Sequence, residues 1–166
     1  AGYDHIRKHC ECLLSVVPQG DPWVFVCGSL MIEYLQHLTG CKEYKIFVSD
    51  WLSKVDNRYN AFQYLNSEIK LPEQMYYVLR NGLVHSFTMK PNRKEGFINS
   101  ILLSHDAPHF THKTDNGFDS CILNAEVFIT DLIKVIDFIY NRAEKDIELR
   151  QSIIIFWTKN PPIGPV

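Results

Sequence analysis

The sequence predicts a single all-α domain over residues 1–166: an antiparallel helical bundle with a small β-hairpin or three-strand insertion at about 89–123, before the long C-terminal helices. Its 166 residues match the roughly 100–200 residues of one domain. Apolar residues recur at three-four spacing along most of the chain, as in amphipathic helices joined by short loops. Only the insertion lacks this spacing, and it is rich in turn-forming residues.

The composition narrows the class of protein. Hydrophobic residues are 46% and charged residues 22% of the chain, which is ordinary for a globular protein and excludes disorder throughout. The formal net charge of −2 excludes a protein that coats nucleic acid with a generally basic surface. Aromatic residues, at 13%, exceed what one small core needs. Some of them are therefore expected at an interface.

Two further features predict where the protein resides. No apolar run is long enough for a transmembrane helix, and the first residues resemble no signal peptide. The five cysteines form no CxxC pair, so we expect reduced thiols in a cytoplasmic protein without a membrane association.

The first half of the chain is predicted to be helical. The first helix, Tyr3–Val17, ends at Pro18. The second, Val24–Leu38, follows Asp21 as its N-cap and stops at Gly40. These boundaries follow from the preference of Asp for N-caps and of Gly for helix ends.

Four more segments complete the helical prediction. A third apolar stripe covers Tyr44–Val55, and a short fourth helix with weaker caps is expected at Tyr59–Ile69. After the insertion, Asn124 caps a strongly amphipathic helix, and a last helix covers Glu144–Thr158. Within the insertion, the expected strands are Ile98–His105, His109–Lys113 and Phe118–Leu123.

The segment Met75–Thr88 allows two interpretations. As a hairpin, two β-prone runs flank Asn81-Gly82, which is a strong short-range turn signal. As a helix, the segment follows a first-turn proline, Pro72, and places Met75, Leu79 and Leu83 on one face. A glycine inside a helix costs about 1 kcal/mol relative to alanine. Local propensity alone therefore slightly favours the hairpin.

The run Arg80-Asn81-Gly82-Leu83-Val84-His85 resembles the motif of the HEPN family (higher eukaryote and prokaryote nucleotide-binding domains). That motif is an Arg, usually followed by a polar residue, and a His after four to six intervening residues. The resemblance implies an all-α bundle with the motif near the end of an inner helix. It therefore favours the helix over the hairpin, and it rests mainly on Arg80–His85.

In active members of the family, these residues cleave RNA without a metal. The resemblance implies that His85 is the general base that activates the ribose 2′-OH, and that Arg80 stabilises the phosphorane. Asn81, four residues before His85, shares its face in an α-helix and would fix the imidazole tautomer. Arg80 lies about 140° from His85 around an ideal α-helix. The helix must therefore distort near Gly82, or the Arg80 side chain must curl back.

The resemblance also implies partners. Family members commonly form homodimers in which two motifs face one cleft, and many accompany a nucleotidyltransferase-type protein. The leading hypothesis is thus an endoribonuclease of toxin or defence type that acts on RNA with no cofactor. The alternative is a non-catalytic module of the same kind, which dimerises, docks a partner or binds a nucleotide.

A third hypothesis concerns the histidines of the insertion. His105, His109 and His112, with Asp106 and Asp115 nearby, offer possible metal ligands. On a strand, however, His109 and His112 point to opposite faces. We therefore expect no metal site, and a polar, solvated hairpin that shapes the neighbouring cleft.

Overall fold

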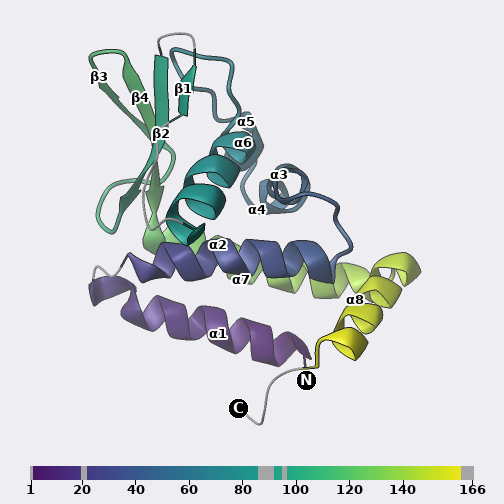
Figure 1. Cartoon of the computed structure of the whole chain (residues 1–166). Coiled ribbons are helices and arrows are strands. Elements are labelled where there is room, and N and C mark those ends of the chain that lie inside the picture. Colours follow the sequence, from purple (N-terminus) through teal and green to yellow (C-terminus); the bar gives the residue numbers. More distant parts are fainter. Residues whose placement is uncertain (1, 20–21, 86–91, 95–96, 162–166) are drawn as a thin grey trace.

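Long helices and a mixed sheet share one core in this computed structural model, which describes residues 2–19, 22–85, 92–94 and 97–161. Four long helices form one side of the molecule (Figure 1): α1 (Gly2–Val16), α2 (Trp23–Leu38), α7 (Ala125–Ala143) and α8 (Ile147–Lys159). A 3-10 turn, η1 (Val17–Gln19), follows α1. These elements confirm the predicted helices at both ends of the chain.

Side-chain caps explain where the last two helices begin. The Asn124 side chain accepts a hydrogen bond from the Val127 N–H at 3.1 Å. Asp146 accepts from the Leu149 N–H at 3.0 Å. Each cap satisfies one of the free N–H groups of a first helical turn. The cap predicted at Asp21 lies outside the described residues.

The middle of the chain forms shorter helical pieces. A continuous helical segment consists of α3 (Tyr44–Phe47), the π-helical η2 (Val48–Leu52) and α4 (Ser53–Val55). After α5 (Arg58–Ala61), a second segment consists of α6 (Leu71–Met75) and the π-helical η3 (Tyr76–Val84). In Figure 1 this second helix runs from beside the sheet down to α2.

The fourth predicted helix is wrong beyond Ala61, because tertiary hydrogen bonds hold this stretch as a loop with a turn at residues 65–66. The Ser67 hydroxyl donates to the Asn99 side chain at 2.9 Å, and Asn99 donates to Asn66 at 2.8 Å. The Leu65 N–H donates to the buried Asp119 carboxylate. Serine and asparagine side chains that bond elsewhere compete with helix formation.

The sheet has four strands in the order β1-β2-β4-β3. They are β1 (Asn92–Lys94), β2 (Phe97–Ser104), β3 (Thr111–Asp115) and β4 (Phe118–Asn124). The hairpin β3–β4 turns at Asn116 and Gly117, which have φ values of 40° and 86°. β2 and β4 are parallel, with Ile101 opposite Cys121.

The predicted all-α class is therefore wrong, because the sheet belongs to the core. Ile101, Cys121 and Leu123 are fully buried in the same cluster as the helical side chains. β3, which lies between β2 and β4 in the sequence, pairs on the far side of β4, so β2 and β4 become parallel neighbours. Local turn signals predict only hairpins between consecutive strands. The expected strands exist, but their arrangement makes a mixed α and β fold. None of the described helices has the length and apolar composition that crossing a membrane requires.

Candidate active site at Arg80 and His85

The segment Met75–Thr88, predicted as either hairpin or helix, is helical up to His85, and its last three residues lie outside the described residues. Lys70 is extended at its start, Pro72 occupies the first turn, and helical structure continues through His85. From Tyr76 to Val84 the helix is widened to the π form. In a π-helix the backbone hydrogen bond joins residues five apart, and such segments are frequent at functional sites.

The π segment brings Arg80 and His85 together. A spacing of five separates two side chains by about 140° around an α-helix, and this angle is smaller in the wider π-helix, whose backbone hydrogen bonds join residues five apart. The Arg80 Nη1 group donates a hydrogen bond to His85 Nε2. Arginine has only N–H donors, so Nε2 is the acceptor in this contact. Of the two alternatives that the sequence left open, the structure shows the distorted helix.

A third residue holds the guanidinium from the other side. Glu33 on α2 accepts a hydrogen bond from Arg80 Nη2 at 2.7 Å. The Arg80 and Glu33 side chains are 26% and 27% exposed, so the ion pair is partly shielded from solvent. Arg80 is therefore fixed between a carboxylate and an imidazole.

Sequence reasoning missed Glu33, although the sequence contains a signal. Glu33 is the one Asp, Glu, Lys or Arg residue within the 16 residues of α2. A single carboxylate in an otherwise apolar helix needs a partner, because burying an unpaired charge is unfavourable. The partner is Arg80, which the sequence separates from Glu33 by 47 positions.

Asn81 does not take its predicted role. Its side chain is half-buried, and no hydrogen bond joins it to His85 among the described residues. The prediction assumed an α-helix, in which residues four apart share a face. In the structure the helix is widened here, and the residue in contact with the imidazole is Arg80.

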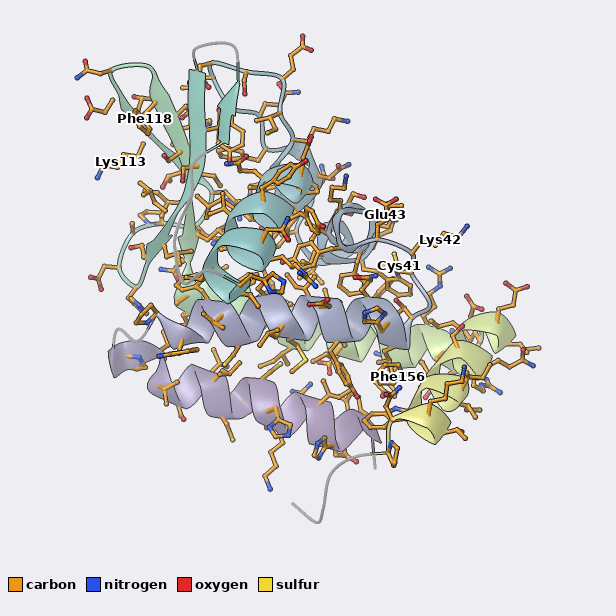
Figure 2. The ribbon with its side chains drawn as sticks, viewed as in Figure 1. Cys41, Lys42, Glu43, Lys113, Phe118 and Phe156 are labelled. Atoms are coloured by element: carbon orange, nitrogen blue, oxygen red, sulfur yellow. The ribbon has the colours of Figure 1, made fainter. Side chains whose placement is uncertain are left out.

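A pocket of about 370 Å³ lies beside this ion pair. We call it the α2–α3 pocket; it is lined by Glu33, Gln36, His37, Lys42, Glu43, Tyr44, Lys45, Tyr76 and Arg80. Figure 2 shows Lys42 and Glu43 on the loop that joins α2 to α3. The pocket therefore combines three elements that the sequence separates.

The loop that forms one wall of the pocket is fixed to α2. Gly40 has a φ of 70°, a left-handed conformation that glycine adopts without strain and that ends the helix. The Cys41 N–H then donates to the Gln36 carbonyl at 3.0 Å, and the Gln36 side chain donates to the Cys41 carbonyl at 3.2 Å. This return of the chain places Lys42 beside α2.

Tyrosines form the floor and flank of the pocket. Tyr44 is buried, and its hydroxyl lies 3.0 Å from the Ser29 hydroxyl. Burial raises the pKa of Tyr44 well above its ordinary range, so the phenol is neutral at physiological pH. Tyr76 is half-buried and packs on Tyr44, with ring centroids 6.0 Å apart. Lys45 Nζ lies 5.9 Å from the centre of the Tyr76 ring.

The insertion histidines occupy separate environments. His109 is buried, contrary to the expected solvated hairpin, and its Nδ1 accepts a hydrogen bond from the Asn124 N–H at 2.8 Å. His112 pairs with Asp119 at 3.1 Å and stacks on Phe62. Among the described residues, no cluster of three or more potential ligands is arranged to hold a metal ion.

Comparison of the chain with protein-family models, curated proteins and solved structures finds no match. The resemblance at Arg80–His85 therefore stays a prediction.

Proposed function

We propose that this protein is an endoribonuclease that cleaves RNA by attack of a ribose 2′-OH on the adjacent phosphate. The observation that carries this proposal is the contact between Arg80 and His85 at the edge of the α2–α3 pocket. A permanent cation suited to phosphate thus lies next to an imidazole, a side chain suited to accept a proton. His85 is exposed and Arg80 is partly exposed, so both are accessible to a substrate.

The proton transfers follow from the groups present. A substrate phosphate draws the Arg80 guanidinium away from His85, which frees the Nε2 lone pair. His85 Nε2 then takes the proton of the 2′-OH, the 2′-oxygen bonds to phosphorus, and the bond from phosphorus to the 5′-oxygen breaks. The departing 5′-oxygen takes a proton from a general acid. His37, the second imidazole beside Arg80, is the candidate for this acid within one chain.

Arg80 stabilises the charge that gathers on the phosphorane. Two of its five N–H groups are used by His85 and Glu33, so three are free for phosphate oxygens. Glu33 keeps the guanidinium in place before the substrate arrives. Positioned donors of this kind act strongly where charge develops in the transition state.

We further propose a homodimer, in which His85 of a second copy is the alternative general acid. Support comes from apolar side chains that α8 leaves exposed, namely Ile147, Ile154 and Ile155. Burying such side chains between two copies is favourable. A nucleotidyltransferase-type partner and a role in a toxin or defence system belong to the same proposal, through the resemblance of Arg80–His85 to the HEPN motif.

The test is an RNA cleavage assay in EDTA. We expect products that end in a 2′,3′-cyclic phosphate, because the attacking nucleophile is the ribose itself. His85→Ala should lower the rate about 100- to 10,000-fold, the usual contribution of general acid–base catalysis. His9→Ala, which changes an exposed histidine on α1, should cleave at the normal rate. Equal rates for the two variants would contradict the proposal.

A second candidate function is a non-catalytic nucleotide-binding or partner-docking module. The ion pair between Arg80 and Glu33 favours it, because a paired guanidinium offers less net charge to a reacting phosphate. In that case, RNA or nucleotide binds but the EDTA assay gives no cyclic phosphate product.

A further inference from the structure

The α2–α3 pocket carries an excess of positive charge in a chain whose net charge is −2. Lys42, Lys45 and Arg80 line it together with two carboxylates. Glu33 pairs with Arg80 at 2.7 Å, and Glu43 lies 3.9 Å from Lys45 Nζ. Within the described ranges, Lys42 has no ion-pair partner, and it is exposed. A local cation excess of this kind suits an anionic ligand.

The pocket has the size and lining of a site for one nucleotide. Its volume of about 370 Å³ falls at the lower end of small-ligand sites, which span roughly 300–1,000 Å³. Tyr76 supplies an aromatic ring next to Lys45, and Lys42 lines the same pocket. An aromatic ring beside cations is the usual arrangement for stacking a base while the phosphate is held by charge.

The position of the pocket relates it to the proposed reaction. Arg80 belongs to both sites: Nη2 binds Glu33 in the pocket wall, and Nη1 binds His85. A nucleotide in the pocket is therefore the neighbour of the nucleotide whose phosphate reacts at His85.

We propose that the α2–α3 pocket binds a nucleotide of single-stranded RNA that flanks the cleaved one, with its phosphate on Lys42 and Lys45 and its base on Tyr76. The identity of the ligand rests on the proposed function, whereas the residues that bind it do not. The pocket fixes the register of the strand, so that the 2′-OH of the next nucleotide faces His85.

Binding is separated from cleavage by a 2′-O-methyl RNA oligonucleotide, which lacks the attacking hydroxyl. Fluorescence anisotropy at several salt concentrations compares Lys42→Gln/Lys45→Gln with Lys8→Gln/Lys145→Gln, which removes the same charge from exposed positions elsewhere. We expect the pocket variant to bind at least about tenfold more weakly. The slope of log affinity against log salt should fall in magnitude by about 0.7 per lysine.

The aromatic contribution has its own matched pair. Tyr76→Leu should weaken binding about fivefold or more without changing the salt slope. Tyr77→Leu changes an exposed neighbour outside the pocket lining and should leave binding unchanged. Thermal unfolding of each variant identifies any loss that comes from the fold, since Tyr76 packs on Tyr44.

The outcomes separate the two proposals. If the pocket variant binds the oligonucleotide as tightly as its control, the inference is overturned, even if the protein cleaves RNA. If binding depends on Lys42, Lys45 and Tyr76 but the normal protein never cleaves, the inference stands and only the ribonuclease proposal fails. If adenosine 5′-monophosphate binds in a way that depends on the two lysines and the oligonucleotide does not bind at all, then RNA is not the ligand.

Discussion

Arg80 is the residue on which the two proposed sites meet, and its geometry matters as much as its charge. Its guanidinium binds Glu33 and His85 through different nitrogens. Lysine keeps the charge but has a single nitrogen and no planar fork.

We therefore expect Arg80→Lys to lower kcat/KM for RNA about 100-fold or more, as for the loss of a positioned donor to the transition state. Arg142→Lys, an exposed conservative change near the end of α7, should leave kcat/KM unchanged. A small effect of Arg80→Lys would mean that Arg80 acts only as a remote charge.

His109 predicts how the stability of the protein depends on pH. Burial lowers its pKa to about 4, and Arg58 adds to this effect. Its Nδ1 faces the N–H of Asn124, so protonation would place two donors against each other. The unfolded chain binds this proton near pH 6.5 and the folded protein does not, so stability falls as pH decreases from about 6.5 to about 4.

The loss of unfolding free energy over this window should be about 3 kcal/mol, from the difference between the two pKa values. His109→Asn keeps an acceptor without a titrating group and should flatten this part of the profile in urea unfolding. His5→Asn, on α1, should retain the normal slope. The pKa values of Asp56 and Asp137 are lowered, so the protonation of these two carboxylates affects stability only at still lower pH.

At the scale of the element, the π segment Tyr76–Val84 sets the spacing of the candidate site. Arg80 and His85 are five positions apart, and the wider helix brings them into contact. Local sequence signals did not predict this width. The sequence indicated only that a regular α-helix would keep the two residues apart.

Exchanging two adjacent residues tests the spacing of five. In Val84→His/His85→Val, the histidine lies four residues from Arg80 and takes the half-buried position of Val84 instead of the exposed position of His85. We expect RNA cleavage to fall about as far as in His85→Ala, with little change in helical circular dichroism. Normal cleavage by the exchanged variant would show that a spacing of four serves equally well.

At the scale of the whole molecule, the sheet and the helices unfold as one unit if they share one core. Ile101 on β2 is fully buried in that core, while Leu102, the next residue on the same strand, is exposed. Ile101→Ala should lower the unfolding free energy by about 2–5 kcal/mol, and Leu102→Ala much less.

Tryptophan fluorescence follows the unfolding of the helices and not of the sheet. The three tryptophans, Trp23, Trp51 and Trp157, lie in helical segments, so their fluorescence reports helix packing. In Ile101→Ala, the midpoint of unfolding followed by tryptophan fluorescence should shift together with the midpoint followed by far-ultraviolet circular dichroism. An unchanged fluorescence midpoint would mean that the sheet is an independent attachment to a helical bundle.

The sequence by itself determined the elements whose signals are local. Three-four spacing predicted α7 and α8, with Asn124 as the cap of α7, and Asn116-Gly117 predicted the β3–β4 turn. Such features depend on contacts within a few residues, so they are visible along the chain. Arg80 and His85 were singled out only through the resemblance of residues 80–85 to a family motif, which stays a prediction.

Tertiary structure alone decided the features that depend on distant partners. The parallel pairing of β2 with β4, the loop after Ala61 and the placement of Glu33 on Arg80 all join segments far apart in sequence. Their free energy comes from burial and from hydrogen bonds that exist only once the chain has folded. The α2–α3 pocket exists for the same reason, since the end of α2, the loop after Gly40 and the π-helix meet only in the folded protein.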